Sequence, residues 1–314
     1  MGLSFRQILR WFPEFRRLEK REARLQAEVA RLQGDLAEWS RFSPPGHFYS
    51  PLPSQGEIAD AFARGGFGPP FAAVDLNETA QFERLERFAG WYPEQPFPEQ
   101  AIPERRYYLD NPSYGHYDAI MLYGMLREAR PRRVIEVGSG FSSAAMLDLN
   151  ETVLGGEVQF TFIDPDMTRL RPLLRAGDQG RVTLIEKRVQ DVPLATFETL
   201  GENDVLFIDS SHVSKVGSDV NRLYFDVIPA LAPGVLIHIH DVAGNLEYPR
   251  DWLEEGRAWN EQYLLRAFLM NNHAYRLELF SAWLWNQKHD VIRDRMPLCA
   301  RGGGGQIWLR KLTR

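Results

Sequence analysis

From residue 115 onwards the sequence alternates between short apolar segments and longer amphipathic ones, and this alternation constrains the fold more than any other feature. The apolar segments are typical of β-strands because they are short, rich in β-branched residues and followed by glycine or acidic residues. Such alternation predicts a doubly wound, mostly parallel α/β sheet over residues 115–314. The expected strands lie within 132–140, 158–166, 181–192, 205–212, 234–242 and 302–312, and the expected helices within 116–130, 141–154, 167–177 and 216–231.

Residues 1–40 and 41–114 precede this domain and differ from it in pattern. A 4–3 spacing of apolar residues predicts a coiled-coil helix in the first segment, which either pairs with a second copy as a homo-oligomer or lies on its own domain. The second segment begins with prolines that exclude a helix and continues as a cap of short helices and turns. His47 and Tyr49 within it are candidate substrate contacts. The apolar seam consists of Leu18, Leu25, Val29, Leu32, Leu36 and Trp39.

The composition bounds the class of protein. A net charge of −5 argues against nucleic-acid binding by phosphate neutralisation. The single cysteine, Cys299, favours a reducing, cytoplasmic compartment. The chain lacks an apolar run of the ~18 residues that a transmembrane helix needs. Its mixed apolar and basic start, residues 1–12, predicts a helix packed on the protein or a partner subunit, with a membrane-surface helix as the less favoured alternative.

Acidic residues follow nearly every expected strand. In a doubly wound sheet the ligand binds beyond the carboxyl ends of the strands, so these residues should meet at one site. Capping of the next helix explains one such acid, but it is a poor explanation for a whole series. The candidate site residues are Glu136, Gly138, Ser139, Gly140, Asp164, Gln190, Asp191, Asp209, His212, His240 and Asp241.

The glycine loop GSGFSS alone is a weak signal for nucleotide binding. Asp164 lies about two dozen residues further on, where a carboxylate binds a ribose diol, and an NAD-binding protein would share both features. Glu136 discriminates between the two ligands. A carboxylate beside the loop repels a pyrophosphate but suits the amino and sulfonium groups of S-adenosylmethionine, which the sequence therefore favours.

The strings VIEVGSG, FIDPD, VQDVP and LFIDSSH resemble the motif series of class I S-adenosylmethionine-dependent methyltransferases. Longer strings, such as IDSSHVSKVGSDVN and GVLIHIHDV, resemble a bacterial subgroup often met among surface-polysaccharide genes. The resemblance covers roughly residues 45–314 and implies a Rossmann-like, seven-stranded sheet with a terminal antiparallel strand. It also implies that Glu136, Gly138, Ser139 and Gly140 line the methionine half of the cofactor, that Asp164 binds the ribose, and that Gln190 and Asp191 lie beside the adenine.

Asp209 and the pair His240–Asp241 end consecutive parallel strands, so we expect them to lie side by side. This pattern is similar to metal-dependent O-methyltransferases of the catechol and macrolide-sugar types, which implies a divalent cation such as Mg²⁺ or Mn²⁺. An imidazole at His240 is softer than a carboxylate and shifts the preference towards manganese, iron or zinc. By the same resemblance Asp209 also lies beside the cofactor.

His212 follows Asp209 by three residues, where sugar-type relatives carry a histidine base, so it is the candidate general base. The alternative is that His212 only begins the following helix. Lys215 is a second candidate base. His238 is expected in the core or supporting the site, with direct ligation as the alternative. The aromatic residues Tyr248, Trp252 and Trp259 stack on a sugar or form the core of an inserted helix pair.

Taken together, the sequence predicts an S-adenosylmethionine-dependent, metal-assisted O-methyltransferase that acts on a hydroxyl of a sugar, a glycan or a glycosylated small molecule. Two alternatives stay open at this point. One is a cephalosporin-hydroxylase-like enzyme or another small-molecule methyltransferase, because such enzymes share much of this scaffold. The other is an oligomeric scaffold that binds the cofactor without turnover.

Overall fold

The computed structural model describes residues 12–40, 42–65 and 71–313, and the chain divides into two units. The first unit comprises the chain up to residue 66 together with 253–258, and the second comprises 67–252 and 259–314. None of the helices in the described ranges is long and apolar enough to cross a membrane. The helix expected over residues 1–12 lies almost wholly outside these ranges.

The described part of the first unit up to residue 65 contains the helices α2 (Pro13–Ser40) and α3 (Gln55–Ala63). The N-terminal helix predicted from the 4–3 spacing is therefore confirmed, while its pairing stays a prediction. A capping box starts α3: the Ser54 side chain accepts from the backbone N–H of Glu57, and the Glu57 carboxylate accepts from the backbone N–H of Ser54.

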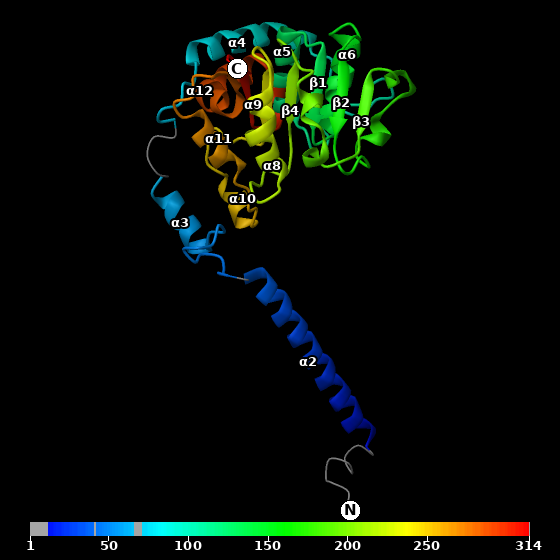
Figure 1. Ribbon diagram of the computed structural model, residues 1–314, viewed down its shortest axis with the longest axis vertical. Helices are drawn as coiled ribbons and strands as arrows, with labels where there is room; N and C mark the ends of the chain where they lie inside the picture. The colour runs from blue at the N-terminus through cyan, green and yellow to red at the C-terminus, as the bar shows by residue number, and fades with distance from the viewer. Residues whose placement is uncertain (1–11, 41, 66–70, 314) are drawn as a thin grey trace, which may run out of the picture. The chain divides into compact units, whose positions relative to one another are not determined.

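The second unit is built on a seven-stranded sheet in the order β3-β2-β1-β4-β5-β7-β6 (Figure 1). The first five strands are parallel, and β7 is antiparallel to both of its neighbours, which confirms the predicted fold. Their apolar side chains are buried, as in parallel sheets that are covered on both faces. The strands are β1 (Arg133–Val137), β2 (Gln159–Ile163), β3 (Val182–Ile185), β4 (Val205–Ile208), β5 (Leu236–His240), β6 (Tyr275–Phe280) and β7 (Gln306–Lys311).

Helices and short 3₁₀ turns connect the strands. The helices are α4 (Glu78–Trp91), α5 (His116–Ala129), α6 (Phe141–Thr152), α7 (Leu194–Phe197), α8 (Asp219–Arg222), α9 (Ile228–Ala230), α10 (Arg250–Glu254), α11 (Glu261–Leu269) and α12 (Ser281–Arg295). A π-helical turn, Leu223–Val227, joins α8 to α9. The 3₁₀ turns are Tyr92–Glu94, Arg171–Leu173, Ala176–Asp178, Val189–Asp191 and Pro297–Arg301.

Three expectations differ from the structure in detail. The helix predicted over 167–177 is wrong: two 3₁₀ turns stand there, because Pro172 offers no N–H and the backbone at Leu174 is extended. The helix predicted over 216–231 begins only at Asp219, after Ser218 caps it. The sequence did not locate β6 and α12, whose residues lack a clear period.

The sheet core includes His238, which is fully buried. Its ring stacks on Phe207 at 3.7 Å between ring centroids, and Trp308 approaches it edge-on at 4.9 Å. Burial and the neighbouring His240 hold the pKa of His238 well below its usual value, so the ring is neutral. This is the core position that the sequence favoured for His238.

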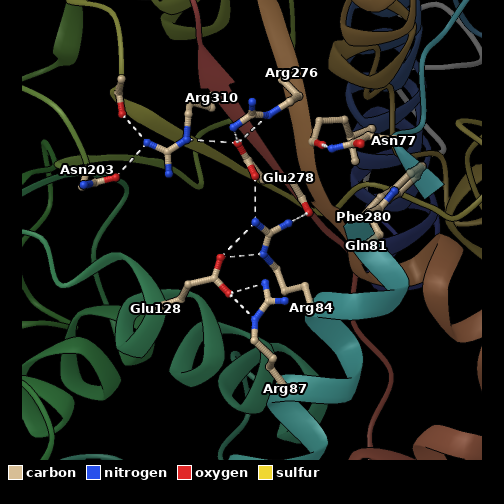
Figure 2. A network of polar contacts seen from close by, with 12 residues as sticks. Asn77, Gln81, Arg84, Arg87, Glu128, Asn203, Arg276, Glu278, Phe280 and Arg310 are labelled. Carbon is tan, nitrogen blue, oxygen red and sulfur yellow. Dashed lines mark hydrogen bonds and ion pairs between the residues drawn. The ribbon is translucent and has the colours of Figure 1, made fainter. Parts of the chain in front are cut away.

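A network of ion pairs ties α4 to the outer strand β6 (Figure 2). Arg84 is 9% exposed, lies 2.8 Å from the carboxylate of Glu278, and also donates to the Glu278 backbone carbonyl. Arg276 and Arg310 contact the other carboxylate oxygen of Glu278, which lowers its pKa although burial alone would raise it. Arg84 also reaches Glu128 on α5. One buried carboxylate therefore organises this side of the sheet.

We expect Arg84→Ala to lower the free energy of unfolding by about 3 kcal/mol, because it removes one partner of a buried ion pair. Arg87→Ala is the matched control, since Arg87 pairs with the same Glu128 but is 45% exposed. The control should change stability by less than ~1 kcal/mol. Urea denaturation of both variants measures the difference, and equal effects would contradict the role given to Glu278.

Candidate active site at the carboxyl edge of the sheet

The glycine loop between β1 and α6 packs directly against the end of β4. Gly138 has a φ of +87°, and a Cβ atom there would lie 1.7 Å from the backbone oxygen of Asp209. Only glycine allows this approach and this backbone conformation. The next backbone amide, that of Ser139, donates to Asp164 at 2.9 Å. The loop therefore brings the ends of β1, β2 and β4 together, as the sequence predicted.

Glu136 is fully buried beneath this loop. Its two carboxylate oxygens accept hydrogen bonds from the hydroxyls of Ser142 and Ser143 at the start of α6. Burial raises the pKa of Glu136 to about 8, although the two hydroxyls lower it. A ligand that places a cationic group here would favour the ionised carboxylate.

Two cavities open above the sheet edge and share Gly138, Asp164 and Asp209. The larger, about 420 Å³, is also lined by Gln190 and Lys215. The smaller, about 180 Å³, is lined by Tyr114, Ser139, Gly140, Ser142 and Arg169.

These cavities bring together most of the residues expected at the cofactor. Two of these residues line neither cavity: Asp191, which pairs with Arg188 on the surface, and Glu136, which is buried beneath the glycine loop. Lys215 lies in the loop before α8 and lines the larger cavity beside Gly217, and Gln190 donates to the Gly217 carbonyl. Lys215 is therefore next to the expected cofactor residues.

Asp209, His212 and Asp241 form a compact cluster beside these cavities. The Nε2 atom of His212 lies 3.4 Å from one oxygen of Asp209 and 3.4 Å from one oxygen of Asp241. His212 and Asp241 both have left-handed backbones, with φ of 59° and 56°. Non-glycine residues adopt this conformation at a cost, which is typical of functional sites.

Glu261, at the start of α11, holds the other side of the His212 ring. Nδ1 of His212 lies 2.9 Å from a carboxylate oxygen of Glu261, which is 1% exposed. The backbone amides of Asn260 and Glu261 also donate to the His212 carbonyl. Burial would lower the pKa of His212, but the carboxylates of Asp209, Glu261 and Asp241 raise it to about 10. The three carboxylates around His212 thus give the cluster an excess of negative charge that a cation would offset.

His240 lies beneath the cluster. Its Nε2 is 3.8 Å from Asp241 and 3.9 Å from Asp118, a buried carboxylate on α5. Burial raises the pKa of Asp118 to about 6, while His240 and the amide of Gln306 lower it. Of the two histidines, His212 is the one that clusters with Asp209 and Asp241. The assignment of His240 as a metal ligand stays a prediction.

The separations within the cluster suit a shared cation. Ligand atoms about 2.0–2.2 Å from one metal ion lie about 3–3.5 Å from one another, which is the spacing of Nε2 and the two carboxylate oxygens. The two carboxylates match magnesium or manganese, and Nε2 of His212 either completes the donor set, which favours manganese, iron or zinc, or stays free to accept a proton. The donor set therefore fits a divalent cation.

The expected substrate aromatics occupy different environments. The ring of Trp259 lies 4.4 Å from the ring of His212, and Trp252 contacts Trp259 edge-on at 5.1 Å. Tyr248 is buried, and its hydroxyl accepts from the backbone amide of Gln262, so it belongs to the core of this insertion. His47 and Tyr49 belong to the first unit, where they contact each other, and their substrate role stays a prediction.

Sequence reasoning missed Arg169, Glu261 and Asp118. Arg169 follows the acidic end of β2 by five residues, and Asp118 stands on a helix that precedes the first strand. Glu261 comes twenty residues after Asp241, in the inserted segment. Only a tertiary structure brings these three residues to the site, although the spacing Asn260-Glu261 before an apolar run indicates the start of a helix.

Comparison with known proteins agrees with this architecture. Residues 135–242, from within β1 to just beyond β5, match a family model described as a methyltransferase domain. An uncharacterized protein of Archaeoglobus fulgidus is 33% identical over 175 residues, which are 53% of this chain and 77% of that protein.

Solved structures of methyltransferases are also similar. A structure of CmcI with Mg and SAM has a TM-score of 0.40 and 21% identity, covering 71% of this chain and 84% of that chain. The O-methyltransferase TomG of Streptomyces achromogenes, in complex with SAM, has a TM-score of 0.41 and 14% identity, covering 74% of this chain and 90% of that chain.

The family model spans the glycine loop and the ends of β1, β2 and β4, which line both cavities, and the end of β5, which is followed by Asp241. By this match the chain belongs to the methyltransferases, and its sheet order and glycine loop are those expected of the class I, S-adenosylmethionine-dependent enzymes.

Proposed function

We propose that this enzyme transfers the methyl group of S-adenosylmethionine to a hydroxyl group of a sugar, a glycan or a glycosylated small molecule, with the assistance of a divalent cation. The observation that carries the proposal is the position of Asp209. This residue lines both cavities and also belongs to the cluster with His212 and Asp241. An acceptor held at the cluster therefore lies beside the cofactor, which positions the two reacting groups.

In the proposed cofactor pose, Asp164 accepts hydrogen bonds from the ribose hydroxyls. Each of its oxygens already accepts one backbone N–H, from Ser139 and Asp166, and each keeps a further lone pair. Gln190 lies towards the adenine. The ammonium of the methionine moiety approaches the buried Glu136, whose pKa is raised by burial and would be lowered by a cationic partner.

Arg169 completes the methionine side of this pose. It is the one cation among the residues that line the smaller cavity, and a Cβ on Gly140 would lie 2.8 Å from its Cδ. The acids Asp164 and Asp209 line the same cavity and do not suit a carboxylate ligand. We therefore place the cofactor carboxylate at Arg169, where a charge-assisted hydrogen bond forms.

Arg169→Ala should weaken the binding of S-adenosylhomocysteine by about 10–100-fold, because a hydrogen bond to a charged group is lost. Binding of 5′-methylthioadenosine, which lacks the carboxylate, should stay close to wild type. Asp164→Ala is the control, since it should weaken both ligands through the ribose. Calorimetric titration measures all four affinities, and an equal loss of both ligands in the Arg169 variant would contradict the assignment.

Asp209 and Asp241 would hold a divalent cation, which when bound would supply a Lewis acid that makes an acceptor hydroxyl more acidic. His212 then takes the hydroxyl proton at Nε2. The hydrogen bond from Nδ1 to Glu261 fixes the ring orientation and leaves Nε2 to face the acceptor. The carboxylates of Asp209, Glu261 and Asp241 raise the pKa of the ring, and a cation held by the two aspartates would offset part of that effect and bring the pKa down towards the range in which His212 can accept a proton.

Asp241→Asn should weaken the binding of Mn²⁺, measured by calorimetric titration in the absence of acceptor. His212→Ala should leave that affinity close to wild type but lower turnover by about 10²–10⁴-fold, the usual contribution of a general base. A parallel loss of Mn²⁺ affinity in both variants would make His212 a third ligand instead of the base. Chelation of the cation should abolish turnover in the wild type.

The acceptor class rests on two features. The strings around Asp209 and Asp241 resemble a subgroup found among surface-polysaccharide genes, and the half-buried indoles of Trp252 and Trp259 give the site an apolar wall. Such a wall suits the C–H face of a sugar ring.

A screen of nucleotide sugars and glycans with methyl-labelled cofactor tests the acceptor class. We expect a labelled product that survives mild alkali, because a methyl ether resists hydrolysis. A label that mild alkali releases as methanol would indicate a methyl ester on a carboxyl group and would overturn the hydroxyl proposal. Transfer to non-sugar phenols alone would overturn the sugar assignment.

A further inference from the structure

Helix α2 exposes a continuous apolar stripe. Five of its apolar side chains are more than half exposed: Leu18 (62%), Leu25 (57%), Val29 (52%), Leu32 (51%) and Leu36 (68%). They follow one another at spacings of seven, four, three and four residues, which places them on one face of the helix. Exposed apolar stripes of this length mark an interaction surface.

The spacing of the stripe specifies the shape of what covers it. Alternating steps of three and four residues match a second helix with the same repeat, because each side chain then enters a gap between four residues of the partner. A second copy of this chain carries such a helix in the same register. The pattern breaks only at Glu22, which stands at a seam position between Leu18 and Leu25.

We propose that α2 pairs with α2 of a second copy in an antiparallel arrangement, in which Leu25 packs against Val29 of the second copy and Leu18 against its Leu36. In this register the residue numbers of two seam residues that face each other sum to 54, as for Leu25 with Val29 and Leu18 with Leu36. Residue 27 therefore lies at the centre of the pair, and every apolar seam residue except Leu32 faces another apolar one.

Glu22 favours the antiparallel direction. In a parallel pair it would face its own copy, which brings two carboxylates together within an apolar seam. In the antiparallel pair it faces Leu32, and the two Glu22 side chains lie about 15 Å apart along the axis, at 1.5 Å per residue. Separation by this distance leaves little repulsion between them.

The residues that flank the seam favour the same direction. A parallel pair would set Glu14 against Glu19 of the second copy, two like charges. The antiparallel pair sets Arg21 beside Asp35 of the second copy, two opposite charges, on both sides of the centre, and it brings the two Glu28 side chains near each other at the centre. Glu28 and Asp35 also hold Arg31 on their own helix, at 2.7 and 2.8 Å, so the acidic pair is already oriented.

Disulfide cross-linking tests both the partner and the direction. Leu18→Cys and Leu36→Cys are made separately in the full-length chain, in which the native Cys299 is buried, and are oxidised alone and after mixing. In the antiparallel pair residue 18 lies about 27 Å along the axis from its own copy. A disulfide needs Cα atoms within about 7 Å, so only the mixture should form a cross-linked dimer.

Lys20→Cys and Gly34→Cys are the matched control. The residue numbers of this pair also sum to 54, so the two positions lie at the same level along the axis of the proposed pair. Both lie on the outer face of the helix, however, so their mixture should not cross-link. Cross-linking of each single seam variant alone would show a parallel pair and overturn the proposal. Absence of any cross-link, with a monomeric mass in light scattering, would show that a second copy does not cover the stripe and would also overturn it.

Discussion

The close approach of Gly138 to the backbone of Asp209 is the contact on which the rest of the site depends. It joins the ends of β1 and β4, at the point where the order of strands in the sheet changes direction. Because β4 pairs in register with β5, the same contact fixes where Asp241 lies. A side chain at position 138 would separate β1 from β4, and both cavities would lose their common wall.

The site concentrates negative charge in a space that excludes water. Glu136, Asp118 and Glu261 are buried, and their pKa values are raised by that burial. Asp209 behaves differently, since His240 and His212 lower its pKa against the effect of burial. The two histidines therefore serve as positive partners of Asp209. A cationic cofactor and a divalent cation would take over that role on binding.

The sequence predicted the parts of the site that follow from strand order. Asp209 and Asp241 are neighbours because consecutive parallel strands end at the same edge, and Gly138 and Asp164 follow from the loop after β1 and the end of β2.

It could not predict Glu261, Arg169 or Asp118, because their positions depend on how α11, the segment after β2 and α5 pack. The sequence also could not distinguish the environments of Tyr248 and Trp259. The burial of Tyr248 and the contact of Trp259 with His212 both depend on the tertiary structure. The helix expected over 167–177 failed for a local reason, the ring of Pro172.

The position of β7 has a consequence for the order in which the sheet assembles. This strand follows β6 in the chain but lies between β5 and β6, so those two strands never pair directly. Until β7 is in place, the unpaired N–H and C=O groups of β5 form an open edge next to Asp241. The five parallel strands therefore keep one edge open to pairing with another chain until a strand from beyond β6 in the sequence closes it.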